Sequence, residues 1–307
     1  MARFVVRVPP CLDWLQTPSR TAQAFSAAFD CSHSLRTHKM WRFELAVAFL
    51  SFFCIVPRLN AATKQQFTIT KDPQAIAIAQ KALAAMGGAQ ALLAYQDSQA
   101  TGTYTVYGGL TPTTYPITLK CKGTQETRVE LQKPSGTTVR VVNQGQGAIT
   151  RPDGTVIHLL MNNTLAERVN HIPLLSILAE YQNGTISIQY QGTSQVSGQA
   201  ADVVAVSLVP TTDAIQGPLF ASMTQTIFYV DQTTGLIDKI QFTNYAENDP
   251  NSPQKVEVYL GSWQSVNGIS VPFHQTTYTD GNLESDLVLS SVSFNAGLAD
   301  SEFVLPQ

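Results

Sequence analysis

The feature that most constrains the fold is the stretch from Met223 to Phe294, where short runs of alternating apolar and polar residues are separated by turn sequences. The turn sequences are Asp231–Gly235, Asn267–Gly268 and Asp280–Asn282. Alternation with a period of two predicts strands, and turns rich in Gly and Asn predict hairpins between them. The alternation is one-sided, because Ile240 and Phe242 share a face that Lys239 and Gln241 do not. The stretch therefore predicts an antiparallel meander with one apolar face that must be covered.

The same alternation recurs upstream and predicts about eleven strands in total. A helix is expected from Asp72, with Pro73 in its first turn and Gly87–Gly88 at its end. A helical insert is expected at 164–170, where Thr164 and Glu167 form a capping-box pattern, and at 173–182 after Pro173. Residues 210–222 are predicted to form a loop.

Two helical segments are too few to cover so large a sheet. The sequence therefore predicts a mainly β fold: an open, strongly curved antiparallel sheet, or half-barrel, with helices covering its concave face. An apolar concavity is expected between helices and sheet. Its candidate lining residues are Ile117, Leu119, Val129, Leu131, Leu175, Ile177, Leu178, Val204, Val206, Ile240, Phe242 and Val258.

The first sixty residues differ from the rest of the chain. Residues 40–61 predict a signal peptide, with an apolar run at Leu45–Val56 and cleavage near Ala61, and an N-terminal anchor is the alternative. Residues 1–39 are interpreted as a mis-assigned or disordered extension, and residues 62–307 as a single β domain. The mature protein is expected to be periplasmic or secreted.

Charge and cysteine usage narrow the class of protein further. Residues 62–307 contain 12 Lys and Arg against 19 Asp and Glu, a net charge of −7, which argues against a nucleic-acid partner. Cys121 is the one cysteine in this part, so no internal disulfide is possible. The core must therefore be stabilised by burial alone, in a protein expected to act as a monomer.

The sequence gives little support for an enzyme. His158, His171 and His274 lack Cys or Glu at metal-ligand spacing, so neither a metal nor a cofactor is predicted. Cys121 lies on the apolar face of its strand and is interpreted as a small buried hydrophobe. Glu284 and Asp286 alternate on a strand and are expected to face water. No catalytic residue is predicted.

Three local patterns resemble a known family, the LolA/LolB-like periplasmic carriers of outer-membrane lipoproteins. They are the strand–turn–strand Phe228–Ile240, the sequence Val266–Pro272, and the ending from Phe294 to Pro306. The resemblance spans about residues 72–306. It implies an open half-barrel whose apolar cavity holds the acyl chains of a lipoprotein. The family's ligand-gating basic residue has no matched position here, and Arg128 is one of several candidates.

The expected function is binding or carriage of a lipid or lipoprotein acyl group without chemistry, with an envelope receptor protein as a possible further partner. One alternative is an envelope sensor or structural relative of the same fold whose cavity is filled by its own side chains. Another, from a different class, is an outer-membrane β-barrel.

Overall fold

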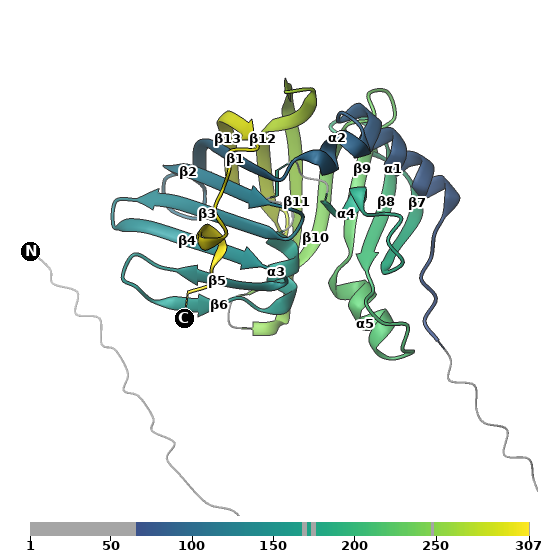
Figure 1. The fold of residues 1–307 in the computed structure, drawn as a ribbon, viewed down its shortest axis with the longest axis horizontal. Coiled ribbons are helices and arrows are strands. Elements are labelled where there is room, and N and C mark those ends of the chain that lie inside the picture. The colour runs from purple at the N-terminus through teal and green to yellow at the C-terminus, as the bar shows by residue number, and fades with distance from the viewer. Residues whose placement is uncertain (1–65, 168–170, 173–175, 247–248, 307) are drawn as a thin grey trace, which may run out of the picture. The chain divides into compact units, whose positions relative to one another are not determined.

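The structure is a computed structural model that describes residues 66–167, 171–172, 176–246 and 249–306 (Figure 1). The chain divides into two units, Met1–Asn60 and Ala61–Gln307, and all described residues belong to the second. Within this second unit, one continuous antiparallel sheet forms the body of the protein.

The sheet contains thirteen strands in the described part of the chain. They are β1 (Asp97–Val106), β2 (Thr113–Lys122), β3 (Glu126–Lys133), β4 (Gly136–Asn143), β5 (Gln146–Thr150), β6 (Val156–His158), β7 (Ile186–Val196), β8 (Gln199–Leu208), β9 (Thr226–Asp231), β10 (Ile237–Ala246), β11 (Asp249–Val266), β12 (Ile269–Thr279) and β13 (Asn282–Phe294). The sequence predicted about eleven. Gln146–Thr150 was not anticipated, because its five residues are too few to show a clear alternation.

The strand order is β6-β5-β4-β3-β2-β1-β13-β12-β11-β10-β9-β8-β7. Every neighbouring pair is also consecutive in the chain except β1 and β13, which join the two halves. The chain must therefore pass from the β6 edge to the opposite β7 edge through residues 159–185. At about 4.8 Å between strands, a flat sheet of this width would measure nearly 60 Å. Curvature shortens this path and places the helical insert on the concave side.

The sheet is open, because the two edge strands of the described structure are β6 and β7 and they do not pair with each other. The predicted open, curved antiparallel sheet is thus confirmed. The barrel alternative is wrong, because it requires a closed sheet. The β7 edge is covered by the segment before the first helix, where the Ile188 amide donates to the Thr70 carbonyl at 2.9 Å.

Helix α1 (Pro73–Ala85) begins as predicted, with Asp72 as its N-cap. The Asp72 carboxylate accepts from the amides of Gln74 and Ala75, and also from the Tyr190 amide of β7 at 3.0 Å. These hydrogen bonds hold the pKa of Asp72 below its usual value, the Tyr190 amide contributing most. One carboxylate thus starts the helix and fixes it to the sheet. The short helix α2 (Ala89–Ala94) follows the Gly pair.

The helical insert differs from the prediction. It contains α3 (Met161–Ala166) and, within the predicted 173–182 segment, the single turn α4 (Ser176–Ala179). Thr164 lies inside α3 rather than at its start, and its hydroxyl donates to the Leu160 carbonyl at 3.2 Å. The capping-box prediction was therefore wrong, because this hydroxyl bonds back along its own helix instead of capping an amide.

A further helix, α5 (Gln216–Met223), replaces most of the predicted loop at 210–222. The Asp213 carboxylate accepts from the amides of Ile215 and Gln216 at 2.9 and 3.0 Å and so initiates the helix. Gly217 and Pro218 resemble helix breakers in sequence, but Pro is tolerated in the first helical turn. The loop prediction was wrong for this reason.

The β9–β10 turn depends on two of its residues, Asp231 and Gly235. The Asp231 carboxylate accepts from the amides of Thr233 and Thr234, and Gly235 has a φ of +76°. A Cβ at Gly235 would lie 3.2 Å from the Ala85 Cβ at the end of α1. The turn therefore needs glycine both for its backbone conformation and for close packing against the helix.

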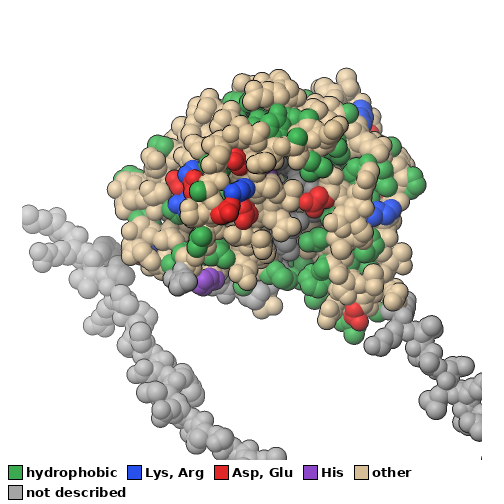
Figure 2. Space-filling view, viewed as in Figure 1, with side chains coloured by type: hydrophobic (Ala, Val, Ile, Leu, Met, Phe, Trp, Pro, Cys, Tyr) green, Lys and Arg blue, Asp and Glu red, His purple; other side chains and the backbone are tan. Residues whose placement is uncertain are grey.

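The last element, the 3-10 helix η2 (Asp300–Phe303), packs on the outer face of β3 and β4. Phe303 is fully buried, and the Asn143 side-chain amide donates to the Phe303 carbonyl at 3.1 Å. Lys120 pairs with Glu302 and Lys122 with Asp300. Figure 2 shows acidic and basic side chains close together to the left of centre. The 3-10 helix η2 thus covers part of the outer face of the sheet at β3 and β4.

Among the helices in the described ranges, none combines the length and apolar character required to span a bilayer.

Candidate functional site

An apolar cavity of about 140 Å³ lies on the inner face of five adjacent strands, β4-β3-β2-β1-β13. The strand register aligns its walls in rows. Thr138, Leu131 and Ile117 form one row, and Arg140, Val129 and Leu119 form the next. The full lining is Tyr104, Ile117, Leu119, Val129, Leu131, Thr138, Arg140 and Leu287. The site is therefore built on rigid strands.

Four of the twelve predicted lining residues surround this cavity: Ile117, Leu119, Val129 and Leu131. Their period-two alternation correctly placed them on one inner face. Whether a ligand binds them stays a prediction.

Six other predicted residues are elsewhere, in the protein core. They are Leu178, Val204, Val206, Ile240, Phe242 and Val258; all but the partly buried Phe242 are buried. The reason is helix α1, whose small residues Ala75, Ala79 and Ala82 are completely buried and allow the helix to approach the β7–β8 part of the sheet closely. Buried side chains of the described residues pack together in that half of the concave face.

The last two predicted residues cannot be placed in the site. Leu175 lies outside the described residues, and the side chain of Ile177 in α4 is likewise outside the described part.

Arg140 gives the cavity its electrostatic character. The guanidinium Nη1 donates to the Glu167 carboxylate, which directly follows α3 and is buried. Asn163 of α3 in turn binds β10 through its amide: Nδ2 donates to the Tyr245 carbonyl at 2.8 Å, and Oδ1 accepts from the Tyr245 amide at 2.9 Å. The wall of the cavity is thus connected through the helical insert to the other half of the sheet.

Tyr104 adds a second polar group to the cavity. Burial raises the pKa of this phenol, so it is neutral at physiological pH and can both donate and accept a hydrogen bond. The cavity therefore combines an apolar floor with one guanidinium, already paired with a carboxylate, and one neutral phenol. This chemistry suits an apolar ligand with a polar end and offers no activated nucleophile.

Sequence reasoning missed Tyr104, Thr138, Arg140 and Leu287. Val139 and Val141 alternate with Arg140 along β4, so the sequence alone does not show which side of this strand faces the cavity. In the structure Val141 is buried on the outer side, in the part of β4 that η2 covers. The candidate gating residue Arg128 is also on that side, where Nη1 donates to the Glu302 carbonyl at 3.1 Å.

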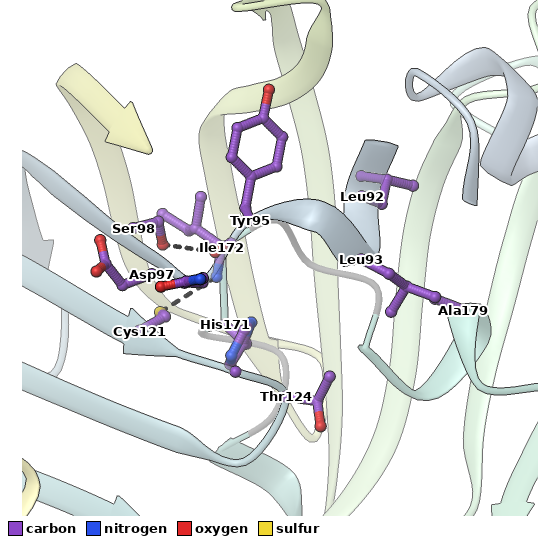
Figure 3. A pocket seen from close by; sticks show the side chains of 12 residues that line it. Leu92, Leu93, Tyr95, Asp97, Ser98, Cys121, Thr124, His171, Ile172 and Ala179 are labelled. Carbon is purple, nitrogen blue, oxygen red and sulfur yellow. Dashed lines mark hydrogen bonds between the residues drawn. The ribbon is translucent and has the colours of Figure 1, made fainter. Parts of the chain in front are cut away.

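A smaller pocket of about 30 Å³ lies where the helical insert meets β1 and β2 (Figure 3). The Ile172 amide donates to the Cys121 sulfur at 3.3 Å, and the Ser98 hydroxyl donates to the Ile172 carbonyl at 2.6 Å. Burial raises the pKa of Cys121 to about 11, so its sulfur is a thiol and not a nucleophilic thiolate. The prediction of a small buried Cys121 is confirmed, and its contact with Ile172 anchors the insert to the sheet.

Within the described ranges, no three His, Cys, Asp or Glu side chains are arranged to hold a metal ion. Asp286 accepts from Thr276 at 2.6 Å and from Tyr107 at 2.8 Å on the outer face, with His274 3.1 Å away. These hydrogen bonds give the Asp286 carboxylate a structural role on β13.

The described structure is an open, curved antiparallel sheet with a helical insert on its concave side. No family model and no curated protein matches the sequence. Among solved structures, a Vibrio parahaemolyticus domain named for outer membrane lipoprotein sorting matches with a TM-score of 0.49 and 13% identity, covering 75% of this chain and 96% of that one.

Two further structures match at the same level. A DUF1329 family protein from Desulfovibrio piger has a TM-score of 0.49 and 14% identity, covering 76% of this chain and 98% of that one. A LolA superfamily protein from Nitrosomonas europaea has a TM-score of 0.48 and 14% identity, covering 75% and 97%. These neighbours include the class that the sequence motifs resemble.

Proposed function

We propose that this protein is an exported, non-enzymatic binder or carrier of lipid or lipoprotein acyl chains, which enter the cavity on β1–β4 and β13. The single observation that carries the proposal is that cavity: an apolar, concave sheet surface that side chains do not fill, with one guanidinium in its wall. The resemblance of the turn and strand motifs to the lipoprotein carriers supports the same function.

The size of the cavity sets a limit on what it can hold in the conformation seen. An apolar protein cavity of about 150 Å³ holds one benzene molecule, so about 140 Å³ corresponds to roughly six carbons. Burying six carbons at about 0.8 kcal/mol each gives about 5 kcal/mol, which barely offsets the cost of association. A long acyl chain therefore requires the insert carrying Asn163 and Glu167 to move away from the sheet.

This reasoning gives a direct test. Native mass spectrometry of the purified protein is expected to show a co-purified lipid, and fatty acids of increasing length are expected to displace a fluorescent acyl probe with rising affinity. The variant Leu131→Glu places a charge in the cavity and is expected to abolish probe binding. Val288→Glu is the matched control, because Val288 is exposed.

The outcome also separates the alternatives. A clean apo mass without probe binding, or equal probe binding by Leu131→Glu and the parent, contradicts the carrier proposal. The same fold would then serve as an envelope sensor or a structural relative. Binding of a receptor protein and a monomeric state are further parts of the proposal, and analytical ultracentrifugation tests the second.

A further inference from the structure

Helix α5 and the loop before it, residues 210–223, form a surface that we name the apolar tip. Ile215 is 82% exposed and Leu219 is 55% exposed, whereas large aliphatic side chains are normally buried. The two residues are four apart, so they lie on the same side of the helix, with the exposed Pro218 beside them. The tip therefore presents an apolar stripe to solvent.

The helix cannot roll to bury this stripe, because its other side is fixed to the protein. Gly217 packs against Phe67 so closely that a Cβ there would lie 2.6 Å from the Phe67 Cβ. The Thr224 hydroxyl, just after the helix, accepts from the Leu208 amide at 2.8 Å and lies 2.9 Å from the Leu208 carbonyl. The exposure of Ile215 and Leu219 is thus imposed by the packing of α5 on β8.

The tip is also almost free of charge. Asp213 is the one charged residue between Val209 and Thr224. Its carboxylate is engaged by the amides at the start of α5, and hydrogen bonds from Gln216 and then Ile215 hold its pKa below the usual value. In Figure 2, hydrophobic side chains lie over α5 at the lower right, beside one acidic side chain. A surface of this kind loses little hydration free energy on leaving water.

The position at which the chain enters the domain indicates what could cover the tip. Gln66 forms a bridge with Asp213, and the Phe67 amide donates to the Thr212 carbonyl at 2.8 Å. In the sequence, the apolar run Leu45–Val56 ends ten residues before Gln66. In the alternative in which this run is retained as an N-terminal anchor, the ten residues span at most about 35 Å, so the anchoring bilayer is within reach of the tip.

We infer that the apolar tip is a membrane-contact site, in which Ile215 and Leu219 enter the interfacial layer of a lipid bilayer. A membrane fits the tip because the contact needs apolar side chains without charge or specific hydrogen bonds. The absence of Lys and Arg from residues 209–224 means that the contact does not require anionic lipids. The inference rests on this surface and on retention of the apolar run as an anchor, and it is independent of the acyl-binding cavity.

The test uses the full chain reconstituted with phosphatidylcholine vesicles, with and without phosphatidylglycerol. The variant Leu219→Trp places a fluorophore in the tip, and Leu110→Trp places one at a fully exposed leucine in the β1–β2 loop. Brominated phosphatidylcholine is expected to quench the emission added by Leu219→Trp and not that added by Leu110→Trp. Phosphatidylglycerol is expected to leave the quenching unchanged.

Three results would overturn the inference. The emission added by Leu219→Trp could be unquenched, it could be quenched no more than that of Leu110→Trp, or it could shift to the blue with protein concentration in the absence of vesicles. The last result would assign the tip to contact with a second copy of the chain. Acyl-probe binding by the double variant Ile215→Ser/Leu219→Ser is expected to equal that of the parent, which separates this test from that of the cavity.

Discussion

The amide of Asn163 is the most direct target for testing how the helical insert is held on the sheet. Its side chain is buried, and it exchanges two hydrogen bonds with the backbone of Tyr245, at 2.8 and 2.9 Å. Each such hydrogen bond contributes about 1 kcal/mol net, and a buried backbone group left unpaired costs about 1–3 kcal/mol. We therefore expect Asn163→Ala to lower the free energy of unfolding by about 2–4 kcal/mol.

Urea denaturation followed by circular dichroism measures this change, and Asn251→Ala, at an exposed position, is the control. Hydrogen exchange then shows whether the loss is local. If the insert opens by itself, the amides of β10 near Tyr245 exchange faster while those of the β12–β13 pair keep their protection. A change below about 0.5 kcal/mol would refute the reasoning, because it would mean that the two hydrogen bonds do not hold the insert in solution.

Three further predictions follow from buried or hydrogen-bonded side chains. Phe303→Ala is expected to destabilise the protein by about 3–5 kcal/mol in the same assay. The control Val304→Ala, at a 65% exposed position, is expected to have almost no effect. Equal effects of the two variants would mean that η2 does not pack on the sheet. Burial raises the pKa of Cys121 to about 11, so this thiol is expected not to react with a thiol reagent at pH 8 in the folded protein. The reagent should then modify the folded parent and the folded Cys121→Ser variant equally. After denaturation it should detect one additional thiol in the parent. The Thr234 amide is the main cause of the lowered pKa of Asp231, so stability is expected to fall as the pH drops below about 4, the unfolded value, towards the lower folded value. Asp231→Asn is expected to make this acid-induced loss shallower, and an unchanged pH profile would argue against the turn as its source.

Much of the architecture could be predicted from the sequence, because strand alternation and turn chemistry are local signals. The meander β9–β13 follows from its turns, and α1 follows from Asp72 and Pro73. The four cavity residues on β2 and β3 follow from the period of two. Each of these features depends on residues close together in the chain, so a single sequence is enough to predict it.

The parts that could not be predicted depend on contacts between distant segments. Strand β4 carries apolar residues on both of its sides. Val141 lies on the outer side, in the part of β4 that η2 covers, and Arg140 lies on the inner side. Similarly, sequence alone does not show that Val204 and Val206 are completely buried in the part of the sheet that α1 contacts. Helix α5 was missed because Gly217 and Pro218 are typical of loops, whereas its contacts with Phe67 and Leu208 come from distant parts of the chain.

The pairing of β1 with β13 has a consequence for how the protein is assembled. Every other strand pair joins consecutive strands along the chain, so each half of the sheet can form from local hairpins as soon as it is synthesised. The two halves can be joined only when the final strand, which ends at Phe294, is available. Contacts between such distant segments form slowly. During its synthesis the protein is therefore expected to pass through a stage with two incomplete sheets and unpaired central edges, in which it depends most on chaperones.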